Sequence, residues 1–367
     1  MLKYVTLWKF YGEIATYFEY LALLFTTLLL GISAFSYKSH AFIFLFISVF
    51  LVLIIGSNSH QLELLYFSLS LVVGAKGLEF KDILKVHFYL SVSFCLLNIV
   101  GSQMGLIENA IQKDQSERLS IIDDTLFRES FGYDWCTDFA SHVFLIILSL
   151  WILKKGIFSK SQLCMLLGIA VFVLLKTGTR MAAAGIVVIA LLSFYIRYRN
   201  PYNISKFVWF FFILSTPICA ILSLCVTMKY DSTDAVWMLV DMFLSGRLSL
   251  GQDAILYKGF PWFGQVYEMY GMGNSMGGDE YNYIDNTYIQ SFVISGIIAT
   301  IVLILCYVRI CYKSYKQKIL IIPLAVFISS LFGIITQFHF NVIYCPLLLA
   351  TFSDLGNSEI QEGQELN

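Results

Sequence analysis

The chain alternates between long, uncharged apolar runs and short polar segments. A helix needs about 20 apolar residues to cross the hydrocarbon core of a bilayer, so each run predicts a membrane-spanning helix. The last run is long enough for two short helices that turn at His339–Asn341. The pattern therefore predicts an all-α polytopic integral membrane protein with about eleven spans, in a range of about 10 to 12. The runs are Tyr20–Tyr37, Ser39–Leu62, Leu64–Ala75, Val86–Ile107, Phe139–Leu153, Ser161–Leu175, Met181–Ile196, Phe207–Met228, Asn286–Val308 and Ile319–Ser353.

The overall composition agrees with this pattern. Hydrophobic residues make up 58% of the 367 residues and charged residues only 13%, whereas soluble domains carry about 25% charged residues. No polar segment is long enough to form a separate soluble catalytic domain. We expect residues 1–353 to form a single membrane domain, followed by a short acidic cytoplasmic tail at 354–367. No basic tract indicates a nucleic-acid partner.

Lysine and arginine residues indicate which loops face the cytoplasm. They concentrate in short loops at 154–160, 197–206 and 309–318, which alternate along the chain as cytoplasmic loops should. In this topology the inner side carries 14 of the 24 basic residues and 6 of the 25 acidic ones, and the outer side carries 10 and 19. The N-terminus then lies outside, unless residues 1–18 lie along the membrane surface as an amphipathic stretch. We therefore expect an acidic outer face.

Two long loops, at 101–138 and 229–285, face outward in this topology. Loops of this length are usually either functional or disordered. The second loop contains Val236–Leu244 and Leu248–Tyr257, which predict two short amphipathic helices at the membrane surface, joined at residues 245–247. A glycine-rich stretch, Gly271–Gly278, follows them.

The sequence lacks the common signatures of metal and nucleotide chemistry. The eight cysteines are scattered singly, almost all within the spans, and the five histidines show no paired ligand spacing. There is no GxxxxGK[ST] phosphate loop and no DxD motif, for which Asp123 and Asp124 are a weak substitute. We therefore expect no metal site and no cofactor, and nucleotide-driven chemistry is disfavoured.

Three arginines stand out on the acidic outer face. Arg180 ends a turn between two spans, Arg247 lies between the two amphipathic segments, and Arg128 lies in the first long loop. Arginine binds phosphate oxygens through two parallel hydrogen bonds, which would suit a lipid-linked diphosphate. Each arginine also has an ordinary alternative, which is pairing with a local acid such as Asp253 or placement at a helix end. On spacing alone we favour the ordinary alternative.

Asp285 opens a polar segment at the outer end of a predicted span. A carboxylate there could accept a proton from a sugar hydroxyl, as a general base does. It could equally cap the helix that follows, because its oxygen and its charge suit the free amides of a helix N-terminus. From the chemistry alone we favour the cap. Asp253 and His339 are weaker candidates for the base, and loop tyrosines such as Tyr288 fit interfacial anchoring better than stacking on sugars.

Four segments resemble motifs of the O-antigen polymerase and ligase superfamily, especially Wzy-type polymerases of capsules and exopolysaccharides. Leu175–Arg180 resembles a small-residue turn that ends in arginine, and Gly246–Gly264 resembles the arginine-helix-"plfG" pattern of a large outer loop. Asp285–Gly296 resembles the opening of the next span. Arg128–Tyr133 is similar to an earlier arginine motif, but Asp134–Cys136 stands where that motif usually has His-Pro-Asn. The likeness covers the second half of the chain, and the first third only through hydropathy.

The resemblance implies a glycosyltransferase of the bacterial plasma membrane that acts at the outer face, periplasmic or extracellular. The reaction would be an inverting transfer that needs no metal and no cofactor. Donor and acceptor would both be oligosaccharide repeat units on undecaprenyl diphosphate, and a repeat-unit flippase and a chain-length regulator would be partners. The site residues implied are Asp285, Arg247 and Arg180 for catalysis, and Arg128, Asn286, Tyr288 and Asp253 for substrate binding.

Two other functions stay open at this stage. The first is the sister activity of an O-antigen-ligase-like glycan transferase, although ligases of the superfamily carry histidine where this chain has Asp285, which favours the polymerase. The second is a multi-pass transporter of lipid-linked or small solutes. A transporter is expected to show two related halves with broken helices, and the hydropathy shows no internal repeat.

Overall fold

The computed structural model describes residues 60–109, 111–113, 127–198, 204–269 and 282–356, together with four single positions near the N-terminus. Several sequence predictions lie outside these residues. They are the spans at 20–37 and 39–59, the surface stretch at 1–18, the acidic pair at 123–124, the glycine-rich stretch at 271–278 and the tail beyond 356.

The chain divides into two compact units. The first unit contains residues 1–22 and 84–201, and the second contains residues 23–83 and 202–367. Both units are therefore discontinuous in sequence, because their segments alternate along the chain.

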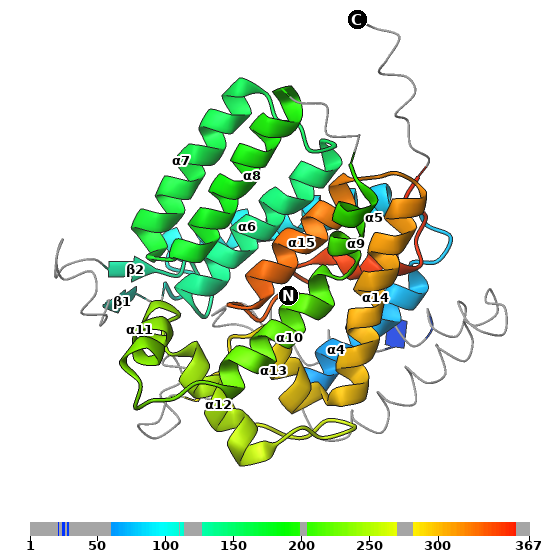
Figure 1. The fold of residues 1–367 in the computed structure, drawn as a ribbon. Helices are drawn as coiled ribbons and strands as arrows, with labels where there is room; N and C mark the ends of the chain where they lie inside the picture. The colour runs from blue at the N-terminus through cyan, green and yellow to red at the C-terminus, as the bar shows by residue number, and fades with distance from the viewer. Residues whose placement is uncertain are drawn as a thin grey trace, which may run out of the picture. The chain divides into compact units, whose positions relative to one another are not determined.

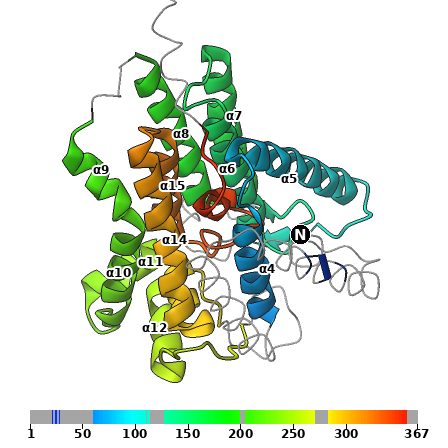
Figure 2. The same cartoon turned by 90° about the vertical axis from the view of Figure 1, so that its right-hand side faces the viewer.

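The first unit is a helical bundle with a small β-ribbon. Helices α6, α7 and α8 run side by side in Figures 1 and 2. Helix α7 starts with a capping box between Ser159 and Gln162, and it ends at Gly178, which has the left-handed conformation typical of a helix C-terminus. The elements are α5 (Phe80–Gln103), which crosses into this unit at residue 84, β1 (Ile111–Lys113), β2 (Phe127–Glu129), α6 (Cys136–Leu153), α7 (Lys160–Thr177) and α8 (Arg180–Tyr198).

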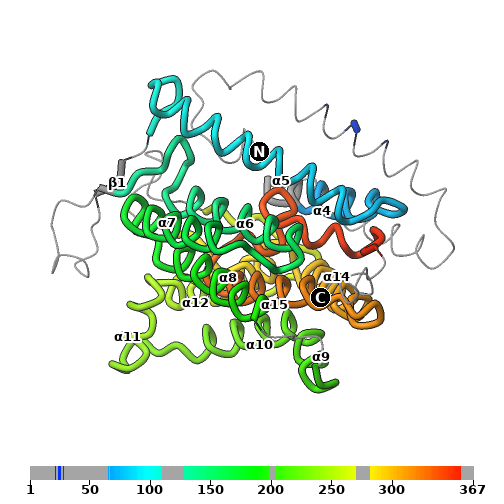
Figure 3. The backbone as a smooth tube through the Cα atoms, turned by 90° about the horizontal axis from the view of Figure 1, so that it is seen from above, coloured from blue at the N-terminus to red at the C-terminus, as the bar shows by residue number. Residues whose placement is uncertain are grey.

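The second unit is built from α4 and from the elements after residue 202. Helices α9, α10 and α11 follow one another along one edge in Figure 3, and the bend of 55° between α9 and α10 is visible in Figure 2. The elements are α4 (His60–Gly74), α9 (Lys206–Ile213), α10 (Ser215–Met228), α11 (Ala235–Phe243), α12 (Arg247–Lys258), α13 (Thr287–Gln290), the π-helix η1 (Ser291–Ser295), α14 (Ile297–Lys316), α15 (Ile321–Gly333) and the 3-10 helix η2 (Pro346–Thr351).

The described helices support an all-α membrane protein. Among the described residues, α5, α6, α7, α8 and α14 are long and apolar enough to cross a membrane, and the bent pair α9–α10 would make a sixth. These do not confirm the predicted total of about eleven. The two short helices predicted in the second long loop are present as α11 and α12, and their placement at the membrane surface stays a prediction.

The predicted span Asn286–Val308 is wrong as a single helix, because it breaks at Gly296. This glycine has a φ of 88°, and a Cβ atom built on it would lie 2.4 Å from the backbone nitrogen of Gly264. The loop at 259–264 packs against the break, and its Pro261 carbonyl accepts the backbone N–H of Ile297 at 2.9 Å. The carbonyls of the 259–264 loop thus accept the first N–H groups of α14, which a preceding helical turn would otherwise bind. Helix α14 therefore begins only at Ile297.

The predicted pair of short helices in Ile319–Ser353 is also wrong in its second member. Helix α15 forms, but the chain then turns through residues 334–345 and ends in the buried 3-10 helix η2, which packs against α4 and α14. Arg309 donates to the Thr351 carbonyl at 3.1 Å. Asp354 continues the contact, because its N–H donates to the Leu78 carbonyl at 2.8 Å. Six residues of 3-10 helix at about 2 Å per residue are too short to span a bilayer.

Candidate functional site

Arg247 begins α12 directly after a tight corner that separates α12 from α11. Ser245 and Gly246 both have left-handed backbone conformations, with φ of 61° and 78°. Glycine adopts this conformation readily, while serine does so at a cost in free energy. The corner brings the carbonyl of Leu244 to Nη1 of Arg247, which donates to it at 2.8 Å.

The other terminal nitrogen of Arg247 forms an ion pair with Asp285. Nη2 lies 3.1 Å from Oδ2, and the two side chains are 17% and 26% exposed. The pair is therefore partly shielded from water but remains reachable. The Nε atom of Arg247 is buried and has no hydrogen-bond partner among the described residues.

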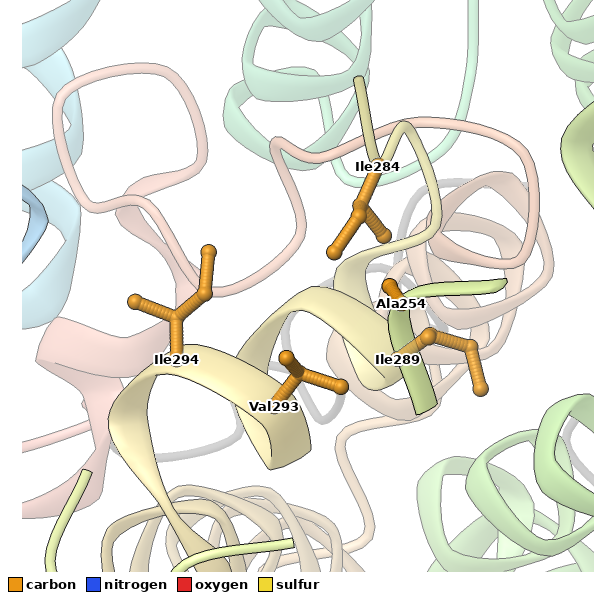
Figure 4. Close-up of a cluster of buried hydrophobic side chains, with 5 residues drawn as sticks. All are labelled: Ala254, Ile284, Ile289, Val293 and Ile294. Atoms are coloured by element: carbon orange, nitrogen blue, oxygen red, sulfur yellow. The ribbon is translucent and has the colours of Figure 1, made fainter. Parts of the chain in front are cut away.

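A hydrophobic cluster holds α12 against the segment that carries Asp285. Figure 4 shows Ala254 of α12 next to Ile284 and Ile289, which flank Asp285 and Asn286 in the chain. Val293 and Ile294 of η1 complete the cluster, and all five side chains are at most 2% exposed. Burial of apolar side chains therefore fixes the relative position of the two segments that supply the ion pair.

Asn286, not Asp285, caps the helix that follows. Its Oδ1 accepts the backbone N–H groups of Tyr288 at 2.9 Å and Ile289 at 3.1 Å, and its Nδ2 donates to Ser223 Oγ at 3.2 Å. The preference for Asp285 as the cap is therefore wrong, because α13 begins one residue later than the sequence suggested. The carboxylate of Asp285 is left to Arg247.

Two opposing influences act on the Asp285 carboxyl group. Burial removes water from the charged form and raises its pKa, and the positive charge of Arg247 lowers it. Burial is the larger influence, so the pKa lies above the ordinary value of 3.8. Asp285 is thus a stronger base than an exposed aspartate, and its basicity depends on the position of Arg247.

Asn286, Tyr288 and Asp253 occupy very different environments. Asn286 is 5% exposed, and its Oδ1 and Nδ2 atoms both form hydrogen bonds within the protein. Tyr288 is fully buried, and its hydroxyl donates to the Ser330 carbonyl at 3.0 Å. Asp253 is exposed on α12. Within the described part of the chain, the acid that pairs with Arg247 is Asp285 and not Asp253.

His339, the other alternative for the base, is enclosed by the protein. It is 1% exposed, its ring stacks on Tyr307 with centroids 4.2 Å apart, and its Nε2 lies 3.2 Å from Ser330 Oγ. A substrate hydroxyl would have to displace these neighbours to reach the ring. The accessibility of the two side chains therefore favours Asp285 over His339 as a base.

In the first unit, Arg128 packs on the turn that ends in Arg180. Strand β2 carries Arg128, whose Nε donates to the Thr177 carbonyl at 2.8 Å, and its neighbour Glu129 pairs with Lys176 at 2.8 Å. Gly178 allows this close approach, because a Cβ atom there would lie 2.9 Å from Arg128 Nε. Arg128 and Glu129, which belong to the first long loop, thus fix the position of the turn between α7 and α8.

Arg180 is exposed at the first position of α8. A cation is unfavourable at a helix N-terminus, where the backbone amides already carry partial positive charge. No described residue forms an ion pair or a hydrogen bond with its guanidinium group. An anion bound at this turn would relieve the unfavourable placement. Arg180 belongs to the first unit and Arg247 to the second.

Two further residues of this region were missed by the sequence reasoning. Ser223 of α10 accepts a hydrogen bond from Asn286, and nothing in the local pattern marks it. Asp241 of α11 binds the first turn of α12, and its signal was a single acid within a nine-residue apolar helix. Among the described residues, no three His, Cys, Asp or Glu side chains gather as they would around a metal ion.

The chain is similar to one known family over part of its length. Residues 163–304 match the family model described as O-antigen ligase. The matched region contains Arg180, Arg247 and Asp285, whereas Arg128 lies before it. Comparisons with curated proteins and with solved structures found no match. The family match, together with the apolar spanning helices, supports a protein of the O-antigen ligase and polymerase superfamily with a glycan-processing function in the membrane.

Proposed function

We propose that the protein is a polysaccharide polymerase that joins oligosaccharide repeat units carried on undecaprenyl diphosphate. The observation that carries the proposal is the half-buried pair of Arg247 and Asp285, which combines an anion-binding fork with a carboxylate base. The family match over residues 163–304 supports a substrate of this lipid-linked class.

The reaction is an inverting glycosyl transfer that needs no metal ion. The acceptor hydroxyl oxygen attacks C1 of the donor sugar while the bond from C1 to the diphosphate oxygen breaks. The hydroxyl proton passes to Asp285, and undecaprenyl diphosphate leaves with the bonding electron pair. Arg247 stabilises the negative charge that grows on the leaving diphosphate, as preorganised donors do at other sites of charge development.

The ion pair also gives the base a trigger. Before substrate arrives, Asp285 neutralises Arg247, and the arginine keeps the carboxylate less basic. A diphosphate competes for the guanidinium group through charge-assisted hydrogen bonds. When Arg247 turns to the phosphate, burial acts on the pKa of Asp285 with less opposition from the arginine charge, and the carboxylate becomes a stronger base. Binding of the donor therefore activates the group that deprotonates the acceptor.

Arg180 and Arg128 have separate parts in this proposal. Arg180 is exposed at the start of α8 and contributes a second cation to the donor diphosphate. Arg128 orders the turn before it through the Thr177 carbonyl. Asn286 and Tyr288 hold the Asp285 segment in place from within the fold, and Asp253 is exposed on the same helix as Arg247, where it can contact sugar hydroxyls.

The proposal places the active face outward, in a plasma-membrane protein with about eleven spans and a single membrane domain at 1–353. A repeat-unit flippase would deliver the substrate, and a chain-length regulator would act on the product. The ligase activity is the second candidate, because the matched family is described as O-antigen ligase. Asp285, at a position where ligases of the superfamily carry histidine, favours the polymerase.

Purified protein in lipid vesicles, supplied with a single lipid-diphosphate repeat unit, separates the candidate functions. A ladder of lengthening lipid-linked products identifies a polymerase. A single transfer that needs a second, different acceptor identifies a ligase, and movement of the substrate without a covalent product identifies a transporter. Arg247→Lys tests the role of the guanidinium group, because lysine keeps the positive charge but cannot form two parallel hydrogen bonds to the diphosphate. We expect this variant to lose rate on the order of 100-fold.

A further inference from the structure

Helix α11 presents apolar side chains outward and its only charged residue inward. Val236, Leu239 and Phe243 are 66%, 64% and 68% exposed, whereas Asp241 on the same helix is only 8% exposed. A carboxylate is costly to bury unless hydrogen bonds compensate for the lost water. The inward position of Asp241 therefore calls for specific partners in the fold.

Those partners are at the first turn of α12. Oδ1 of Asp241 accepts the backbone N–H of Leu248 at 2.8 Å and that of Ser249 at 3.4 Å, and Oδ2 accepts the hydroxyl of Ser249 at 2.8 Å. The residue at the N-cap position of α12 is Gly246, which has no side chain to perform this task. Asp241 thus caps α12 from the preceding helix, and its charge is favourable at a helix N-terminus.

The cap acts on the residues next to Arg247. Leu248, whose amide Asp241 binds, directly follows Arg247, and the Asp241 carbonyl accepts the N–H of Gly246 at 2.9 Å. Asp241 therefore holds the chain on both sides of Arg247. The same corner supplies the Leu244 carbonyl that fixes Nη1, so the direction of the guanidinium group depends on this joint.

We propose that Asp241 is a positioning residue, which sets Arg247 against Asp285 by capping α12 from α11. It touches neither substrate nor reacting atoms. The proposal rests on the proposed function, since it assigns Asp241 a part in the transfer only through Arg247. Loss of the cap frees the α11–α12 corner, and Arg247 then leaves the geometry in which it meets both Asp285 and the donor diphosphate.

The test compares Asp241→Ala and Asp241→Asn in the vesicle assay. Alanine removes the cap, and a displacement of about 1 Å in a positioned group can cost about 100-fold in rate. We expect a loss of about tenfold to 100-fold. Asparagine keeps an acceptor oxygen for the Leu248 amide and should restore the rate to within about threefold of the native protein, because asparagine caps helices about as well as aspartate.

Asp234→Ala is the matched control. Asp234 is also a capping aspartate in the same loop, but it caps α11, through the Val236 N–H at 2.8 Å. We expect its rate to stay within about twofold of the native protein, because N-cap losses elsewhere cost only modest stability. An equal loss in both alanine variants would overturn the positioning role, because it would indicate general destabilisation.

Two further readouts separate positioning from folding. If Asp241→Ala displaces Arg247, the acid limb of the pH–rate profile moves to higher pH, because the arginine no longer lowers the pKa of Asp285. In an Arg247→Gln background, Asp241→Ala should cause no further loss, since contacting residues that act together are not additive. Independent, additive losses or an unmoved acid limb would overturn the proposal. If Asp241→Ala does not fold, the same readouts apply to Asp241→Glu, which keeps the charge but shifts the carboxylate by one methylene.

The failure of this inference differs from the failure of the proposed function. If the native protein forms no ladder of lipid-linked products, the proposed function is wrong whatever Asp241 does. If Arg247→Gln is inactive and Asp241→Ala is fully active with an unmoved acid limb, only the positioning role is wrong.

Discussion

Asp285 and Asn286 are neighbours in the chain with separate contacts. The amide of Asn286 satisfies the helix N-terminus, and the carboxylate of Asp285 meets Arg247. Because an amide does the structural task, the adjacent carboxylate can be replaced without loss of the cap. This separation makes the catalytic role of Asp285 directly testable.

Asp285→Asn is expected to abolish polymer formation while leaving the protein folded. A general base contributes about 100-fold to 10,000-fold to a rate, and asparagine cannot accept the proton. The rate in the vesicle assay measures the loss, and thermal unfolding checks the fold. Asp253→Asn, which changes an exposed acid on the same helix as Arg247, should lower the rate far less. Normal polymerisation by Asp285→Asn would show that the carboxylate is structural.

The pH dependence follows from the raised pKa of Asp285. Since burial holds this pKa above 3.8, the acid limb of the pH–rate profile should lie above that of an exposed aspartate. Arg247→Gln removes the charge that lowers the pKa, so any residual activity should show the limb at still higher pH. A limb that moves to lower pH in this variant would contradict the assignment of Asp285.

The raised pKa of Asp285 also makes the stability of the fold depend on pH. A carboxyl group with a raised folded-state pKa destabilises the fold at pH values above that pKa, and the cost disappears as the pH falls below the unfolded value. Asp285→Asn should therefore not lower the unfolding temperature at neutral pH, which thermal unfolding can check together with the rate.

At the scale of elements, the break at Gly296 separates the site from the spanning helix. Asp285 lies two residues before the short α13–η1 segment, and α14 starts after the break, where the Pro261 carbonyl accepts the Ile297 N–H. The two glycines of the motif, Gly264 and Gly296, pack against each other. The loop after α12 and the helix that follows Asp285 are thereby fastened to each other.

Gly296→Ala is expected to disrupt this joint. The new Cβ atom would lie 2.4 Å from the Gly264 nitrogen, and alanine is strained at a φ of 88°. We expect a clear drop in unfolding temperature and loss of polymerisation. Gly168→Ala is the control, since nothing lies within 4 Å of its Cβ position on α7, and alanine favours a helix over glycine by about 1 kcal/mol. Equal behaviour of the two variants would argue against a role for the close contact.

Hydrophobic periodicity predicted the uniform helices and missed the interruptions. Helices α6, α7, α8, α11 and α12 fall close to their predicted ranges, because each is a continuous apolar or amphipathic stretch bounded by charged or turn-forming residues. The break at Gly296 and the 3-10 helix η2 were missed, since both lie within uninterrupted apolar runs and depend on contacts with distant segments.

The sequence predicted which residues form the site but not how their side chains contact one another. Arg247 and Asp285 were singled out as a cation on an acidic face and a carboxylate at a helix start. Their pairing was not predicted, because it depends on α12 packing through Ala254 on a segment far along the chain. The choice of Asn286 over Asp285 as the cap turned on where the helix begins, which a local pattern fixes only to within a few residues.

At the scale of the whole molecule, the proposed orientation can be tested by labelling. In a variant whose cysteines are replaced by serine, Thr233→Cys, in the long loop before α11, should react with a membrane-impermeant maleimide in intact spheroplasts. Lys154→Cys, in the basic loop before α7, should react only after permeabilisation. Both positions are exposed, so accessibility within the fold does not decide the result. The reverse pattern would place the Arg247–Asp285 pair on the cytoplasmic side.

The contact of η2 with α4 has a consequence for biosynthesis. Helix α4 is made before its partners at 346–354, and all segments of the first unit are made in advance of those partners. At translation rates of about 5–20 residues per second, α4 stays without these partners for tens of seconds. The second unit can close only after residues 346–354 have been made, and a chain cut before residue 346 should be degraded as an unassembled protein instead of persisting as a weak enzyme.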